Sequence, residues 1–232
     1  MPNEKAVVLC SGGLNSAVTT SLAVQNYSVF LLHVHYGHRA DAREADLFEK
    51  QADFFDVRDR LVLEMPHLAK IGGNARVSRK RQIEYALAIS ERESNCYVPG
   101  LIGSLLNAAF GWAWGIGASV IHLGVSENLG PPGPPTSQVH PDYSREFIQL
   151  CGYGLGIAAP GRKITIETPL LELSRTEIVK LGHRLGTPFE LTWSCLSSGT
   201  QPCGGCLGCA TRNRGFLEAT VPDPILLQPA AH

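Results

Sequence analysis

Short apolar runs alternate along this chain with longer segments in which apolar residues recur at helical spacing. The apolar runs predict buried strands at residues 5–10, 28–36, 60–65, 119–125 and 163–168. The longer segments predict helices at residues 15–25, 40–54, 103–115 and 144–158, and a further helix from Ser174 that ends at Gly186. This alternation indicates an α/β fold, a doubly wound parallel five-stranded sheet with helices on both faces.

Two stretches interrupt this alternation. Residues 66–95 are polar and weakly patterned, which predicts a loop with some helix. Beyond residue 190 the chain is rich in cysteine and then in proline, so we expect little regular structure there. The expected division is therefore a large α/β domain, residues 1–190, followed by a small C-terminal region, residues 191–232.

A parallel sheet of this kind indicates where a ligand binds. Ligands lie at the carboxyl ends of the strands, in the loops that follow them. The candidate loops are therefore residues 11–16, 36–39, 126–145 and 169–175.

Composition and charge exclude some classes of function. Of the 232 residues, 44% are hydrophobic and 18% are charged, and the net charge is −1, so a broad nucleic-acid-binding surface is not expected. The basic run RVSRKR, residues 76–81, is short and is interpreted as a solvated loop. No segment has the pattern of a signal peptide or a membrane span, so we expect a cytoplasmic protein with no membrane partner.

The loop after the first strand has the residues that hold a phosphate. It reads Ser11, Gly12, Gly13, Leu14, Asn15, Ser16. Two glycines allow a sharp turn in which successive N–H groups face one anion, the serines add hydroxyl donors, and the following helix adds its positive end. A tight strand-to-helix turn capped by serine is the alternative. The strand before the loop and the helix after it favour a phosphate-binding and hence nucleotide-binding loop, which makes residues 1–190 a nucleotide-binding domain.

Four of the seven cysteines lie close together near the C-terminus. Cys203, Cys206 and Cys209 form two overlapping CxxC steps, and Cys195 precedes them by a short loop. Four thiolates at this spacing favour a structural Zn²⁺ ion over a disulfide pair or an iron–sulfur cluster, since a closed set of four sulfur ligands suits zinc. Residues 191–232 are therefore predicted to be a zinc-binding region.

His33 and His35 alternate with apolar residues on the second strand. One is expected to face the core and the other the site. A metal-binding role is not favoured, because no third ligand is evident in the sequence.

The phosphate loop resembles the SGGxDS loop of the N-type ATP pyrophosphatases, a superfamily with an adenine nucleotide alpha hydrolase-like fold. Together with the SC-x7-CGGCLGC pattern and the ETPL step at residues 167–170, it resembles the 7-cyano-7-deazaguanine synthase family. Further similarities follow the same order over nearly the whole chain: YGHR at residues 36–39, YVPG at 97–100, GVSE at 124–127, PD at 141–142 and the Arg212 that ends CxxR.

The resemblance implies an ATP-dependent ligase that converts 7-carboxy-7-deazaguanine and ammonia into 7-cyano-7-deazaguanine through an adenylated carboxylate. It implies ATP with Mg²⁺ as the substrate complex, and a homodimer. The loop residues 11–16 would bind the nucleotide, with Asn15 and Ser16 in catalytic positions. Tyr36, Arg39, Glu127 and Asp142 would be substrate contacts.

The departures from the family pattern define the alternatives. Asn15 stands where the motif has Asp, which removes a negative charge that would help to hold Mg²⁺. Leu101 and Ile102 stand where the family has Arg-Asn. These changes favour, as alternatives, a relative that adenylates a different carboxylate or a protein C-terminus, or a catalytically attenuated nucleotide-binding protein. A tRNA thiolase is a further alternative, but it is expected to show a catalytic cysteine pair.

Overall fold

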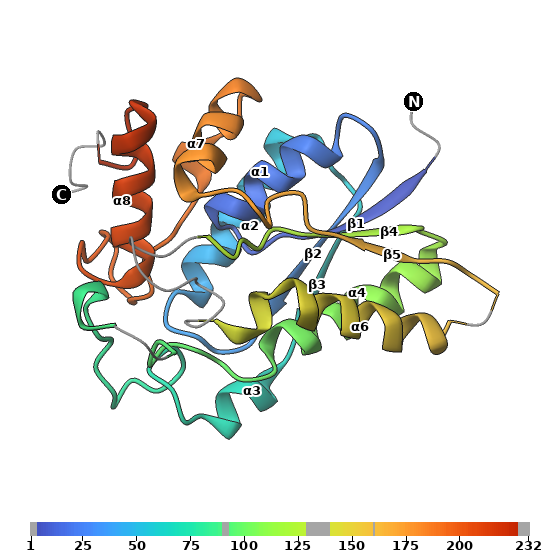
Figure 1. The fold of residues 1–232 in the computed structure, drawn as a ribbon, viewed down its shortest axis with the longest axis horizontal. Coiled ribbons are helices and arrows are strands. Elements are labelled where there is room, and N and C mark those ends of the chain that lie inside the picture. The colour runs from blue at the N-terminus through green and yellow to red at the C-terminus, as the bar shows by residue number, and fades with distance from the viewer. Residues whose placement is uncertain (1–3, 90–92, 129–139, 160, 227–232) are drawn as a thin grey trace.

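The computed structural model describes residues 4–89, 93–128, 140–159 and 161–226. Within these ranges five parallel strands form one sheet in the order β3-β2-β1-β4-β5, as Figure 1 shows. The strands are β1 (Lys5–Leu9), β2 (Ser28–His35), β3 (Arg60–Glu64), β4 (Val120–Leu123) and β5 (Thr165–Glu167). All five lie within the ranges predicted from the apolar runs, so the expected sheet is confirmed.

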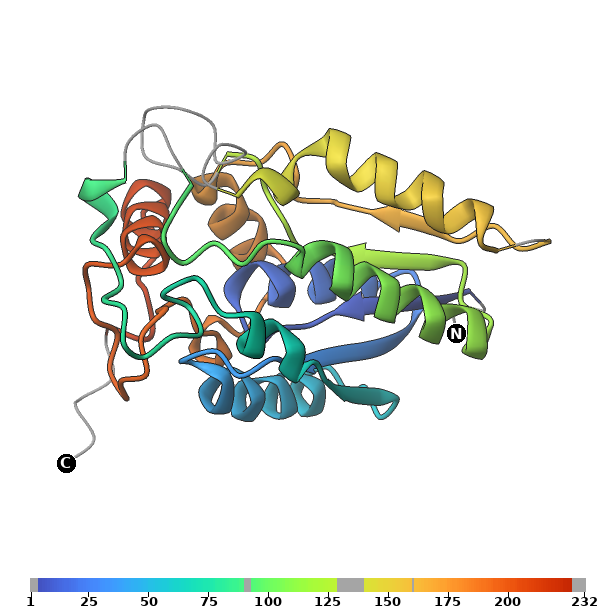
Figure 2. The ribbon, with the colours of Figure 1, turned by 90° about the horizontal axis from the view of Figure 1, so that it is seen from below.

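Helices cover both faces of the sheet (Figures 1 and 2). One face carries α1 (Leu14–Ala23) and α2 (Asp41–Phe54), with α7 (Arg175–Arg184) packed against α1. The other face carries α4 (Leu101–Ile116) and α6 (Arg145–Ile157). Successive strand residues point to opposite faces, so β1 contributes Val7 and Leu9 to the α4 side and Val8 to the α2 side.

The strand order reverses between β1 and β4. The chain adds β2 and β3 on one side of β1, then crosses over to add β4 and β5 on the other side. A crevice opens at the carboxyl ends of strands at such a switch point. The loop after β1, residues 10–13, and the segment after β4, which begins at Gly124, therefore face a common space.

The C-terminal region differs from the expectation of little regular structure. Residues Leu207–Ala219 form a 13-residue helix, α8, which packs on α7. The hydrophobic pattern does not predict this helix, because its buried positions are not a simple apolar stripe. They include Cys209, Thr211, Arg212 and Gly215. A buried ion pair fixes its far end, since Arg212 donates to both carboxylate oxygens of Asp223 at 2.6 and 2.8 Å.

The stretch at residues 66–95 contains α3 (Pro66–Ile71) and a short 3-10 helix, η1 (Ala86–Ala88), in agreement with a loop that has some helix. Two further 3-10 turns are η2 (Pro141–Tyr143) and η3 (Phe189–Leu191). The proline-rich residues 130–135 lie outside the described ranges. Among the helices of the described residues, none combines the length and the apolar character needed to cross a membrane.

Candidate nucleotide site and metal centre

A cavity of about 280 Å³ opens at the carboxyl ends of β1, β2 and β4. Its wall includes the phosphate loop with the start of α1, the end of β2, the start of α4 with η2, and the segment around Trp193 with α8. The cavity therefore lies at the switch point of the sheet, and the C-terminal region forms one side of it.

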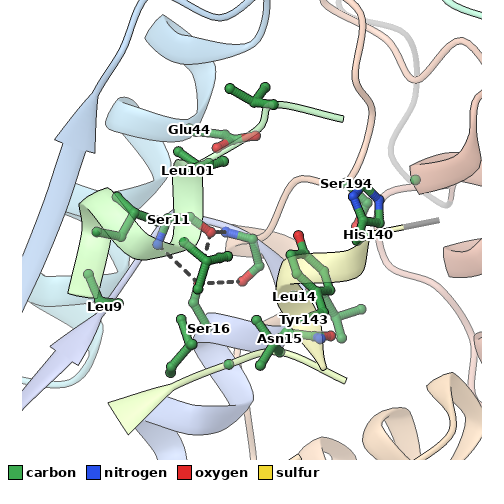
Figure 3. Close-up of a pocket in the computed structure, with 18 of the residues that line it drawn as sticks. Leu9, Ser11, Leu14, Asn15, Ser16, Glu44, Leu101, His140, Tyr143 and Ser194 are labelled. Carbon is green, nitrogen blue, oxygen red and sulfur yellow. Dashed lines mark hydrogen bonds between the residues drawn. The ribbon is translucent and has the colours of Figure 1, made fainter. Parts of the chain in front are cut away.

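The phosphate loop turns at Gly12, where φ is +76°. A Cβ atom at this position would lie 2.3 Å from the backbone oxygen of Glu44, so only glycine fits. The Oγ of Ser16 accepts from the amide of Ser11 at 3.2 Å and donates to the carbonyl of Gly13 at 3.0 Å. These bonds, drawn in Figure 3, hold the loop in a compact turn before the N-terminus of α1.

Arg175 is a cation beside this loop that the sequence analysis did not single out. It is the first residue of α7, only 8% exposed, and lines the cavity. Its Nη1 donates a hydrogen bond to Oδ1 of Asn15, while its Nε has no hydrogen-bond partner among the described residues. Burial and the neighbouring Arg212 lower the pKa of Arg175 to about 10, so the guanidinium remains charged at neutral pH. The sequence signal that could have identified Arg175 is its position in the candidate ligand-binding loop at residues 169–175.

Asp142 lies in η2 on the opposite wall and is 4% exposed. Its Oδ2 accepts from the amide of Ile102 at 3.4 Å, and within the described ranges its Oδ1 has no hydrogen-bond partner. Burial raises the pKa of Asp142 to about 6. Beside it His140 stacks on Tyr143 with ring centroids 4.7 Å apart (Figure 3), and burial lowers the pKa of His140 to about 4.

Tyr36 also lines the cavity and is buried. Its hydroxyl accepts from Nε of Arg76 at 3.2 Å, and Nη2 of Arg76 donates to Glu44 at 2.9 Å. The basic run therefore has two parts: residues 79–81 are exposed as expected, whereas Arg76 is inside the cavity wall, and the interpretation as a wholly solvated loop is wrong for it.

The structure does not bring Arg39 and Glu127 to the cavity wall. Nη2 of Arg39 donates to the carbonyl of Ser78 at 2.7 Å, which ties two loops together. A carboxylate oxygen of Glu127 accepts from the amide of Arg145 at 2.6 Å, at the start of α6. Leu101 and Ile102, by contrast, do line the cavity, where they add apolar side chains beside Asp142.

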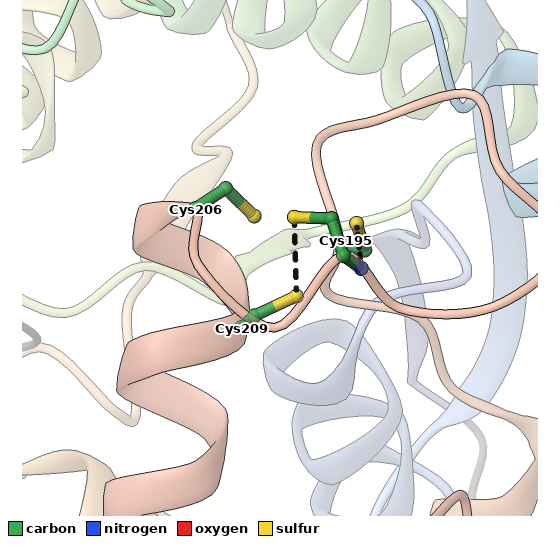
Figure 4. Close-up of side chains that lie close together, drawn as sticks. Cys195, Cys206 and Cys209 are labelled. Carbon is green, nitrogen blue, oxygen red and sulfur yellow. Dashed lines mark hydrogen bonds between the residues drawn. The ribbon is translucent and has the colours of Figure 1, made fainter. Parts of the chain in front are cut away.

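The four C-terminal cysteines come together as the spacing predicts. One sulfur from each of Cys195, Cys203, Cys206 and Cys209 lies within 4.8 Å of all the others, and Figure 4 shows the cluster at the start of α8. Backbone amides donate to two of the sulfurs, at 3.3 and 3.4 Å to Cys195 and at 3.4 Å to Cys206. Such bonds orient thiolates around a metal, so the residues present fit a four-sulfur metal site.

The comparisons with known proteins decide the family. The profile of the family described as "Queuosine biosynthesis protein QueC" matches residues 5–220. The chain belongs to the QueC family. It is 36% identical to the 7-cyano-7-deazaguanine synthase of Chloroherpeton thalassium, over 95% of this chain and 96% of that relative. It is 35% identical to the protein of the same name from Acidobacterium capsulatum, over 99% of this chain and 97% of that relative.

The match to the QueC family includes both features of the site, the phosphate loop at its start and the cysteine cluster near its end. A solved structure, NAD+ synthetase from Burkholderia pseudomallei, is similar at 16% identity with a TM-score of 0.41, over 99% of this chain and 69% of that one.

Proposed function

We propose that this chain converts 7-carboxy-7-deazaguanine and ammonia into 7-cyano-7-deazaguanine with ATP. The observation that carries the proposal is its identity of 35–36% to synthases of that name over nearly the full length of both chains. The hypothesis of a different acceptor is not favoured, because these relatives share one name. The cavity agrees with the proposal. One wall has hydrogen-bond donors for phosphate, and another has aromatic side chains with a buried carboxylate.

The reaction needs two activations of the same oxygen-bearing carbon. In the first, the substrate carboxylate attacks the α-phosphorus of ATP, and pyrophosphate leaves. Ammonia then attacks the acyl adenylate, AMP leaves, and one proton is released, which gives the amide. In the second, the amide oxygen attacks the α-phosphorus of another ATP and pyrophosphate leaves, after which loss of AMP with a proton forms the nitrile. The protein accelerates these steps by placing the reactants and by stabilising the negative charge on pyrophosphate.

The phosphate loop and Arg175 provide that stabilisation in this proposal. Residues 11–16 would hold the polyphosphate through backbone amides and the hydroxyls of Ser11 and Ser16. Asn15 has a neutral side chain whose oxygen already accepts from Arg175, so it is a poor ligand for Mg²⁺. A carboxylate at position 15 would neutralise the positive charge of Arg175, whereas Asn15 leaves that charge available to the phosphates. Mg²⁺ would arrive with ATP as part of the substrate.

Asp142 fits the purine end of the substrate. Its Oδ1 has no partner in the described protein although the side chain is buried. The edge of a deazaguanine ring presents adjacent ring and exocyclic N–H donors, which a carboxylate accepts well. The stacked pair of His140 and Tyr143, with Tyr36 nearby on the wall, offers flat aromatic surface to the planar ring.

We propose Zn²⁺ as the ion of the cysteine site, with a structural role. Its four ligands are all sulfur, which leaves no open position for a reacting group. The remaining expectations from the sequence also stand as proposals: Arg39 and Glu127 as substrate contacts in the complex, a homodimer, a cytoplasmic location and no direct nucleic-acid partner.

The test is to incubate the zinc-loaded protein with ATP, Mg²⁺, ammonia and 7-carboxy-7-deazaguanine, and to follow AMP and the nitrile by mass spectrometry. We expect both products, and neither when the acid is replaced by 7-deazaguanine, which lacks the carboxylate. Absence of AMP from folded protein would contradict the proposal. AMP formation with a different acid alone would establish the other-acceptor hypothesis instead.

A further inference from the structure

A second group of potential metal ligands lies at the end of β2. His33 and His35 project from the strand, and Asp41 is the first residue of α2. One ligand atom from each of the three lies within 4.8 Å of the other two. The third ligand that the sequence did not reveal is thus Asp41, which the turn at residues 36–40 brings back to the strand end.

His33 has a buried nitrogen that nothing in the described protein satisfies. Its Nδ1 lies 3.0 Å from the carbonyl oxygen of Cys10. A carbonyl only accepts, so Nδ1 carries the hydrogen and the Nε2 of the neutral ring has a free lone pair. Nε2 has no hydrogen-bond partner although the residue is only 2% exposed. A metal-binding histidine commonly donates its other ring N–H to a backbone carbonyl, which fixes the tautomer and the orientation of the ring.

Asp41 is held with one oxygen toward the histidines. Its Oδ2 accepts from the amide of Gly37 at 3.1 Å, which fixes the carboxylate. Its Oδ1 lies 3.4 Å from Nδ1 of His35. Two ligand atoms that each lie about 2.1 Å from a tetrahedral ion are roughly 3.4 Å apart, so this separation already suits a Zn²⁺-sized ion.

We propose that His33, His35 and Asp41 form a second metal site for a divalent transition ion of the Zn²⁺ class. Two imidazoles and one carboxylate favour such an ion over Mg²⁺, which prefers oxygen ligands. The site shares no residue with the cysteine cluster. His33 and the neighbouring Glu44 line the cavity, so the ion is at the cavity wall and three protein ligands leave a coordination position open.

A network of ion pairs without metal is the competing explanation. Nε2 of His38 lies 3.2 Å from Oδ1 of Asp41 and 3.4 Å from Glu44, so the Asp41 carboxylate has an imidazole neighbour besides His35 in any case. That network does not involve Nε2 of His33. The two explanations differ in the number of ions that each chain retains.

The experiment measures zinc per chain by elemental analysis after equilibrium dialysis of the full-length protein against micromolar Zn²⁺. We expect two ions in the parent protein and one in His35→Ala and Asp41→Asn. His67→Ala, which removes an exposed histidine on α3, should retain two. A count of one in the parent, or the same count in all four proteins, overturns the proposal.

A second measurement does not depend on the folding of the variants. The parent protein is filled at the cysteine site with Zn²⁺ and then titrated with Co²⁺. We expect the weak visible bands of Co²⁺ bound by nitrogen and oxygen, without the intense near-ultraviolet absorption of thiolate ligands. Absence of any new band at saturating Co²⁺ also overturns the proposal. Neither readout uses ATP, so a failure of this metal-site proposal can be distinguished from a failure of the proposed reaction.

Discussion

Arg175 and Asn15 form a hydrogen-bonded pair between a buried guanidinium and a neutral amide at the phosphate loop. In the part of the chain that the structure describes, the cation has no carboxylate partner, and Arg212 adds a like charge nearby. A buried charge without a counter-charge costs stability. The pair therefore gives the loop a positive potential that suits an anionic ligand.

Asn15→Asp should place a counter-charge beside Arg175. We expect the variant to be more stable, by about 1 kcal/mol or more, because the buried cation gains an ion pair. The added carboxylate also gives Mg²⁺ an oxygen ligand, so half-maximal AMP formation should need less Mg²⁺. Thermal unfolding and Mg²⁺ titration of the rate check the two effects. Unchanged values for both would show that Asn15 does not govern the charge balance of the loop.

Arg175→Met should separate activity from stability. Loss of a charge-assisted contact to phosphate costs about 2 kcal/mol, roughly a 30-fold rise in the KM for ATP. The free energy of unfolding should not fall, since the substitution removes an uncompensated buried charge. Arg184→Met, on the exposed end of α7, is the matched control and should leave the KM unchanged. A normal KM in Arg175→Met would exclude Arg175 from the nucleotide site.

Asp142→Asn should weaken binding of the purine acid while stabilising the protein. Because burial raises the pKa of Asp142 from 3.8 to about 6, the folded state retains its proton between these pH values, and that contribution to stability is lost as pH rises through about 6. The variant should therefore gain about 1–2 kcal/mol at pH 8 and less at pH 5.

The same shift predicts the pH dependence of binding. The ionised carboxylate accepts the purine N–H donors, so the KM for the acid should rise as pH falls below about 6 in the parent protein and lose this dependence in Asp142→Asn. Steady-state kinetics from pH 5 to pH 8 give the comparison, and Asp46→Asn on the exposed side of α2 is the control.

Gly12→Ala and Gly73→Ala distinguish backbone strain from a clash. Both glycines have positive φ, +76° and +82°. The space around Gly73 is open, whereas a Cβ at Gly12 would meet the backbone oxygen of Glu44 at 2.3 Å. We expect Gly73→Ala to cost about 1 kcal/mol and Gly12→Ala clearly more, with loss of ATP binding. Chemical denaturation measures both, and equal costs would contradict the tight approach of the loop to α2.

Cys206→Ser should remove the ion of the cysteine site and loosen α8. Cys206 is buried and precedes the first residue of that helix, so loss of the metal frees the helix N-terminus from residues 195–203. We expect a large fall in Tm, and the same fall on dialysis of the parent protein against a strong chelator. Cys151→Ala, which lies outside the cluster, should behave as the parent. A chelator-resistant Tm would exclude a structural metal.

The centre of the sheet could be predicted because β1 and β4 are buried on both faces and therefore appear as apolar runs. The phosphate loop and the cysteine cluster were also visible, since each depends on residues close together in sequence. Three further residues depend on partners elsewhere in the chain, which no local pattern marks. Arg175 contacts Asn15, 160 positions away, and Arg76 contacts Glu44, 32 positions away. Asp41 meets His35, 6 positions away. α8 was missed for a related reason, because thiol and guanidinium groups occupy its buried side.

The backbone of Trp193 pairs with the phosphate loop: its amide donates to the carbonyl of Gly12 at 3.0 Å, two residues before the first cysteine of the metal cluster. One short segment thus joins the nucleotide cradle to the ion that holds the C-terminal helix. Coupling between two binding sites is reciprocal. If bound metal raises the affinity for ATP by some factor, bound ATP must raise the affinity for the metal by the same factor. Measuring chelator resistance with and without ATP would therefore report on the nucleotide site without any catalytic turnover.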